Sequence, residues 1–101
     1  MGKFIKVAKT SEVPAGSGKV VDVEGKEVGL FNCDGTFYAI DNICRHQGGP
    51  LGEGYVEGTV VTCPWHGWEY DVTSGACQTN PAAKQAKFNV KVEGDDVLIE
   101  V

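Results

Sequence analysis

The sequence predicts an all-β fold, an antiparallel β sandwich with a loop-rich lobe inserted between its two ends. No stretch sustains the 3.6-residue apolar period of an amphipathic helix. Short alternating apolar runs are separated by turn signals about every 8 to 12 residues, which is typical of all-β proteins. Glycine is frequent, with 14 among 101 residues. This length suits one domain, residues 1–101.

The strands are expected where short apolar runs lie between turns. Asp34-Gly35 is the strongest short hairpin signal, because both residue types tolerate positive φ. Residues 24–26 and 94–96 mark two further hairpins, and residues 10–18, rich in Pro and Gly, are expected to form a loop. The expected strands are residues 4–8, 19–23, 27–33, 36–40, 59–62, 68–72, 87–93 and 97–101.

The middle of the chain, residues 42–81, differs from both ends. It contains both histidines, both tryptophans and three of the four cysteines. A turn is expected at residues 71–75. We therefore expect both ends of the chain to form the β scaffold and residues 42–81 to form the inserted lobe.

Charge and hydropathy exclude several functions. The chain has 9 basic and 14 acidic residues and a net charge of -5, which disfavours nucleic acid and suits a basic protein partner. No apolar run approaches the about 20 residues that span a membrane. The N-terminus lacks the apolar core of a secretion signal, so we expect a cytoplasmic protein.

Two Cys/His pairs carry the chemistry. Cys44-Arg-His46 and Cys63-Pro-Trp-His66 are separated by sixteen residues, and glycines surround both. Four such ligands meeting at two loops can hold a metal. A tetrahedral zinc site is one reading, although zinc sites favour wider C-x-x-C and H-x-x-x-H spacings. A [2Fe–2S] cluster with one Cys and one His from each loop fits the pattern better.

Residues 44–51 and 63–71, with Thr73-Ser-Gly75 behind them, resemble the Rieske-type [2Fe–2S] proteins. In order and size the chain is similar to the stand-alone Rieske ferredoxins of bacterial ring-hydroxylating dioxygenase systems. It is equally similar in plan to the small subunit of assimilatory NADH nitrite reductase. The resemblance implies that Cys44 and Cys63 bind the inner iron, and that His46 and His66 bind the outer, solvent-facing iron.

That resemblance implies a soluble, low-potential electron carrier, without a catalytic site, between an NAD(P)H-dependent flavin reductase and a terminal oxygenase. The alternative is a subunit of nitrite reductase that binds its large subunit, and a zinc-stapled binding module is a distant third. A Rieske oxygenase would need a further iron held by two more histidines. The chain has only two histidines, and the resemblance assigns both of them to the cluster. We expect a monomer that binds neither nucleic acid nor membrane.

The chain departs from the high-potential members of this family. Their extra cysteines, which form a disulfide beside the cluster, are absent: Trp65 stands at one position and residues 47–49 at the other. Trp68 replaces a serine that donates a hydrogen bond to sulfide, whereas Tyr70 matches their tyrosine. Fewer hydrogen bonds stabilise the reduced cluster less, so we expect a potential toward roughly −150 mV.

Several neighbours of these motifs have expected roles of their own. Gly48, Gly49 and Gly67 are expected to let the backbone approach the cluster sulfurs closely. Trp65 and Trp68 are expected to pack in the core, and the equally good alternative is that Trp65 shields the cluster or contacts a partner. By resemblance, residues 80–82 form a third loop that covers the cluster. Cys33 and Cys77 are expected to be structural, buried thiols.

Overall fold

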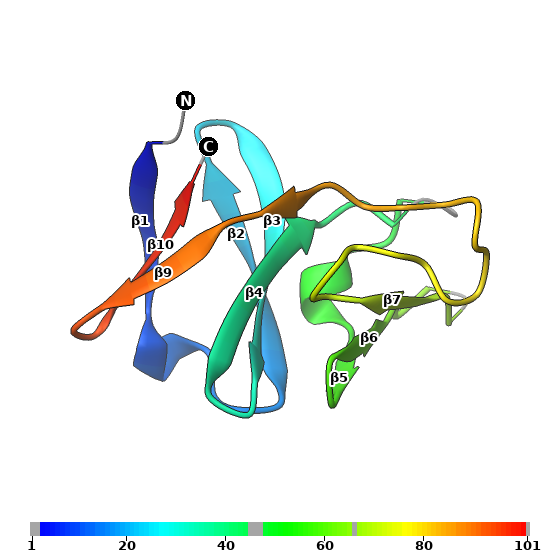
Figure 1. Cartoon of the computed structure of the whole chain (residues 1–101), viewed down its shortest axis with the longest axis horizontal. Helices are drawn as coiled ribbons and strands as arrows, with labels where there is room; N and C mark the ends of the chain where they lie inside the picture. Colours follow the sequence, from blue (N-terminus) through cyan, green and yellow to red (C-terminus); the bar gives the residue numbers. More distant parts are fainter. Residues whose placement is uncertain (1–2, 45–47, 66, 101) are drawn as a thin grey trace.

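The computed structural model describes residues 3–44, 48–65 and 67–100. The scaffold consists of two antiparallel sheets, and a lobe lies beside them between β4 and β8 (Figure 1). One sheet has the order β1-β10-β9 and the other β2-β3-β4-β8. These strands are β1 (Phe4–Lys9), β2 (Ser17–Val23), β3 (Lys26–Cys33), β4 (Thr36–Asp41), β8 (Lys87–Phe88), β9 (Val90–Glu93) and β10 (Asp96–Glu100).

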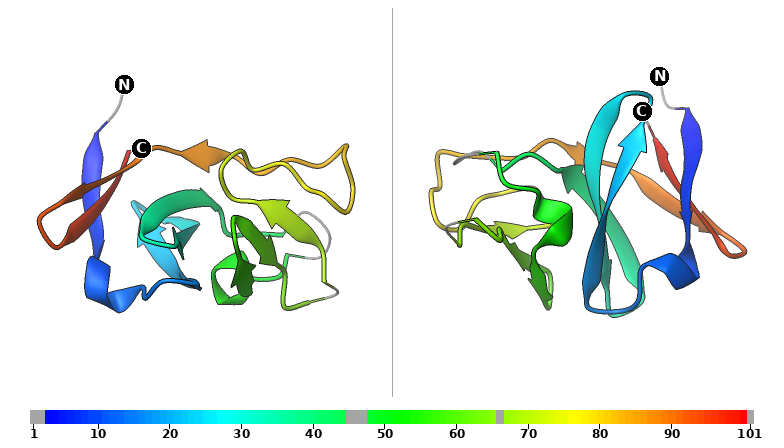
Figure 2. Two further views of the ribbon diagram at one scale, coloured as in Figure 1. Left: turned by 60° about the horizontal axis from the view of Figure 1, so that its bottom comes forward. Right: turned by 180° about the vertical axis from the view of Figure 1, so that it is seen from behind.

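The lobe contains a small antiparallel sheet of its own, with the order β5-β6-β7. Its strands are β5 (Tyr55–Glu57), β6 (Val60–Thr62) and β7 (Glu69–Asp71), preceded by the 3-10 turn η2 (Leu51–Glu53). The chain enters the lobe after β4 and returns to the scaffold before β8, as two further views show (Figure 2). The predicted all-β fold is thus confirmed, and both ends of the chain build the scaffold. Within the described residues, none of the helical segments has the length or hydropathy to cross a bilayer.

Some predicted boundaries were wrong. Residues 10–18 are not one loop, since they hold the 3-10 turn η1 (Thr10–Glu12) and the start of β2. The short strand β5 was missed. The expected strand 87–93 is broken at Asn89, because β8 pairs with β4 and β9 pairs with β10. There the carbonyl of Asn89 accepts the Glu100 N–H at 2.9 Å, and its side-chain amide donates to the Glu100 carboxylate at 2.7 Å.

Two apolar cores meet at β3, whose faces are both buried. Leu30 points into the core between the two scaffold sheets, and Phe31 points into the core between the scaffold and the lobe. All four cysteines belong to the second core, and all are free thiols. Burial of Cys33 and Cys77 in this core agrees with their expected structural role. This core therefore fixes the lobe on the scaffold and surrounds the candidate site.

Candidate functional site

Cys44 lies in a tight loop that follows β4. Its backbone N–H donates to the Gly49 carbonyl at 2.9 Å, and the Gly48 N–H donates back to the Cys44 carbonyl at 2.9 Å. Gly48 has a φ of +77°, a conformation that glycine adopts without steric cost. These bonds close the loop on itself and leave the Cys44 side chain buried.

Cys63 follows β6 in a second closed loop. Its backbone N–H donates to the Trp68 carbonyl at 2.7 Å, and the Trp65 N–H lies 3.4 Å from the Cys63 sulfur. A backbone N–H directed at a cysteine sulfur stabilises the thiolate form, which is the form that binds metal. The Cys63 side chain is buried like that of Cys44.

The two buried sulfurs influence one another. Burial raises the pKa of the Cys63 thiol. The Trp65 N–H opposes that rise, and the neighbouring Cys44 thiol adds to it. The packing agrees: both side chains belong to one buried core, and Gly49, whose carbonyl accepts the Cys44 N–H, lies against the Cys63 sulfur, although the two cysteines are nineteen positions apart. The structure therefore brings together two of the four predicted ligands.

Gly49 leaves room for these sulfurs. A Cβ atom at this position would lie 2.7 Å from the Cys63 sulfur and 3.0 Å from Cγ of Trp65. No real side chain tolerates such contacts, so the expected close approach is confirmed for Gly49. At Gly67 a Cβ would meet no atom of the described residues within 4 Å, and its φ of +77° is the reason for glycine there.

Tyr70 stands behind the site. It lies on β7, is fully buried, and its hydroxyl is 3.4 Å from the Cys44 sulfur. A metal-bound thiolate carries no proton, so the Tyr70 hydroxyl is the donor in the loaded protein. Both sulfurs thus have a hydrogen-bond donor within reach.

These features fit a [2Fe–2S] cluster. Thiolates are the ligands that iron–sulfur clusters require, and donors directed at sulfur tune their potential. His46 and His66, together with Arg45 and Gln47, lie outside the described residues. Within the described ranges no group of three or more Cys, His, Asp or Glu offers another metal site.

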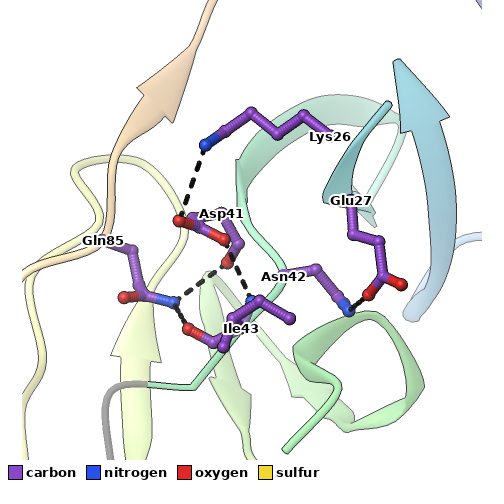
Figure 3. Close-up of polar contacts among 6 residues, drawn as sticks. All are labelled: Lys26, Glu27, Asp41, Asn42, Ile43 and Gln85. Atoms are coloured by element: carbon purple, nitrogen blue, oxygen red, sulfur yellow. Dashed lines mark hydrogen bonds and ion pairs between the residues drawn. The ribbon is translucent and has the colours of Figure 1, made fainter. Parts of the chain in front are cut away.

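The base of the Cys44 loop is held by polar side chains (Figure 3). The Asp41 carboxylate accepts the Ile43 N–H at 3.0 Å and lies 3.9 Å from the Lys26 ammonium group. The fully buried Asn42 donates to Glu27 at 3.1 Å and accepts the Gly52 N–H at 2.7 Å. Sequence reasoning missed this network, because its partners are brought together only by folding.

The two tryptophans differ. Trp65 is 50% exposed beside Gly49, so packing in the core does not account for it. Trp68 is partly buried and packs against the core between scaffold and lobe. In the expected third loop, Pro81 is exposed and the Asn80 N–H donates to the Cys77 sulfur at 3.3 Å.

Comparison with known proteins decides the family. The model of the Rieske [2Fe-2S] domain matches residues 3–97. The chain belongs to the Rieske [2Fe–2S] family. Its cofactor is therefore a Rieske-type [2Fe–2S] cluster, which sets aside the alternative of a zinc-stapled module.

Relatives of this Rieske chain include electron-transfer components. It is 36% identical over 100 residues to the ferredoxin component of the naphthalene 1,2-dioxygenase system of Pseudomonas aeruginosa, covering 98% of this chain and 96% of the relative. It is 28% identical to a chain in the solved complex of reduced oxygenase and oxidised ferredoxin in carbazole 1,9a-dioxygenase. That match has a TM-score of 0.86 and covers 95% of this chain and 91% of that one.

A nitrite reductase subunit shares the fold. A chain assigned as the small subunit of an NADH-dependent nitrite reductase from Mycobacterium tuberculosis has a TM-score of 0.91 at 19% identity. The match covers 100% of this chain and 96% of that chain. At this identity the likeness establishes the common fold alone.

Proposed function

We propose that the chain is a one-electron carrier whose cluster is held by Cys44 and Cys63 on the inner iron and His46 and His66 on the outer iron. The observation that carries the proposal is the burial of two thiols from separate loops in one core. His46 lies two positions after Cys44, and His66 lies three positions after Cys63, so the same loops would supply the histidines. The chain is not itself an enzyme.

When bound, the cluster takes up and releases one electron. Protein groups around the two sulfurs stabilise the added negative charge. The Trp65 N–H and the Tyr70 hydroxyl direct positive dipole ends at the two sulfurs, which favours the more negative state. Burial of both cysteines keeps water away from their sulfurs, and Gly49 keeps a side chain away.

We further propose that the electron comes from an NAD(P)H-dependent flavin reductase and goes to a terminal ring-hydroxylating oxygenase. Support comes from the relatives that are ferredoxin components of dioxygenase systems. A ferredoxin–oxygenase complex among the matching structures supports the direct contact. The net charge of -5 suits a partner with a basic docking surface.

Electron exchange with two partners also bears on the oligomeric state and the location that we expect for the protein. A carrier that leaves one partner for the next works as a single-domain monomer, and we place it in the cytoplasm. The half-exposed Trp65 offers such a partner an aromatic contact beside the site.

The small subunit of nitrite reductase is the second candidate. It rests on the shared fold with such a subunit. The two candidates differ in assembly, because a subunit purifies with a large flavin- and siroheme-containing chain, whereas a carrier purifies alone. Purification of the native protein from its own cell extract, followed by mass determination, distinguishes them.

The ligand assignment is tested by iron and acid-labile sulfide analysis of purified variants. About two irons and two sulfides per chain are expected in the wild-type protein. Cys44→Ser and Cys63→Ser are expected to lose both. Cys33→Ser and Cys77→Ser are matched controls, because these thiols are buried in the same core, and should keep them. Equal loss in all four variants would contradict the assignment.

A further inference from the structure

Three polar side chains are buried among the described residues: Asn32, Asn42 and Gln85. Both asparagines use the oxygen and the nitrogen of their amide group in hydrogen bonds. Gln85 is 1% exposed, and within the described part of the chain its Oε1 has no hydrogen-bond partner. Buried acceptors without a partner are rare and require an explanation.

The amide nitrogen of Gln85 supplies that explanation. It donates to the Asp41 carbonyl at 3.0 Å and also to the Ile43 carbonyl (Figure 3). Ile43 directly precedes Cys44, so Gln85 holds the entry to the Cys44 loop from a position more than 40 residues later in the chain. In the close-up, the Gln85 nitrogen faces both carbonyls and its oxygen points away from them.

Only one orientation of this amide suits the loop. A flipped amide would direct Oε1 at two carbonyl oxygens and lose both hydrogen bonds. The observed orientation leaves Oε1 without a hydrogen-bond partner among the described residues, which is unfavourable for a buried acceptor. The carbonyls of Asp41 and Ile43 therefore determine how Gln85 lies.

The backbone of Gln85 is fixed as well. Its N–H donates to the Gly75 carbonyl at 2.7 Å. A Cβ atom at Gly75 would lie 2.2 Å from the Gln85 carbonyl oxygen, so the two backbones touch. Gln85 thus links the turn at Gly75 to the start of the Cys44 loop.

We propose that Gln85 is a positioning residue for the redox centre, which fixes the Cys44 loop relative to the rest of the lobe. The inference rests on the proposed ligand role of Cys44. Two hydrogen bonds to backbone carbonyls two residues apart hold the start of that loop in place. Without them the Cys44 sulfur moves relative to the Cys63 sulfur, and the environment of the iron that the two thiolates would hold changes.

The test replaces Gln85 with Met, which keeps the length of the side chain and removes both donors. The matched control is Gln78→Met, because Gln78 is an exposed glutamine in the same segment. We expect the EPR g values of the reduced Gln85→Met protein to shift. We also expect its cluster to be lost to a chelator about tenfold faster, the factor for one or two ordinary hydrogen bonds.

Amide hydrogen exchange supplies a readout that does not need the cluster. In Gln85→Met, exchange at Ile43 and Cys44 should accelerate, while exchange at Leu30 in the central strand β3 stays as in the wild type. Exchange, g values and cluster loss that all equal those of Gln78→Met would overturn the proposal. If the wild-type protein holds no cluster, the proposed function fails, and the exchange data still decide the role of Gln85.

A second pair of variants covers the case that Gln85→Met does not fold. Gly75→Ala forces the Gln85 backbone away, whereas Gly58→Ala introduces positive-φ strain at a position where a Cβ meets none of the described residues within 4 Å. Faster exchange at Ile43 in Gly75→Ala alone supports the proposal. Equal exchange in the two glycine variants contradicts it.

Discussion

Removal of the Tyr70 hydroxyl group is expected to change the reduction potential of the cluster. Tyr70→Phe removes that hydroxyl and keeps the ring, which is fully buried on β7. The hydroxyl lies 3.4 Å from the Cys44 sulfur. A hydrogen bond to a thiolate stabilises the reduced cluster more than the oxidised one, because the reduced cluster carries more negative charge. The variant should therefore have the more negative potential.

The magnitude follows from the net strength of one hydrogen bond. Such a bond contributes about 0.5–1.5 kcal/mol. A factor of ten, about 1.4 kcal/mol, corresponds to 59 mV for a one-electron couple. If most of the bond strength is gained on reduction, Tyr70→Phe lowers the potential by roughly 20–60 mV.

Protein-film voltammetry measures this shift. Tyr55→Phe is the matched control, because Tyr55 lies on β5 of the same lobe and its side chain is 79% exposed. Its potential should equal that of the wild type, and iron analysis should give full clusters in both variants. A Tyr70→Phe potential equal to that of the control, or more positive than it, would refute the reasoning.

Three further predictions concern other parts of the site. Gly49→Ala places a Cβ 2.7 Å from the Cys63 sulfur, so less iron should be bound per chain on metal analysis, and full loading would contradict this. Burial, and then the charge of Asp71, raise the pKa of the Cys33 thiol from its ordinary value. The unfolded chain releases this proton first, so the free energy of unfolding should fall as the pH rises above about 9, and urea titrations of Cys33→Ala should show a weaker fall. Trp65→Ala should lower kcat/KM for electron delivery to the oxygenase about five- to thirtyfold at unchanged Tm, as loss of an interfacial aromatic does, and an unchanged rate would contradict a contact there.

The hairpins were predictable because their turns have strict conformational demands. Two-residue turns join β2 to β3 and β3 to β4. Both residues of each turn have positive φ: Glu24 and Gly25 in the first, Asp34 and Gly35 in the second. Asp-Gly tolerates this conformation at both positions, so the sequence alone indicates the turn. By contrast, the break at Asn89 depends on pairing with β4 on one side and β10 on the other, which no local pattern reveals.

The site was predictable to the extent that it consists of short motifs. Cys44 and Cys63 stand out by spacing, and the structure buries both. Gly49 was expected to approach the sulfurs and does so. The role of Gln85 could not be predicted from the sequence, because nothing in the local pattern indicates that this glutamine is buried. Its importance comes from carbonyls more than 40 residues away.

The ligand set of the cluster is the central claim, and low-temperature EPR tests it most directly. The purified protein should be silent as isolated in the oxidised state. After dithionite it should give a rhombic signal whose average g lies clearly below that of all-cysteine [2Fe–2S] proteins, because in the proposed ligand set Cys44 and Cys63 bind one iron and His46 and His66 the other. A signal with the average g of an all-cysteine cluster, or no signal in a sample with one zinc per chain, would contradict the account.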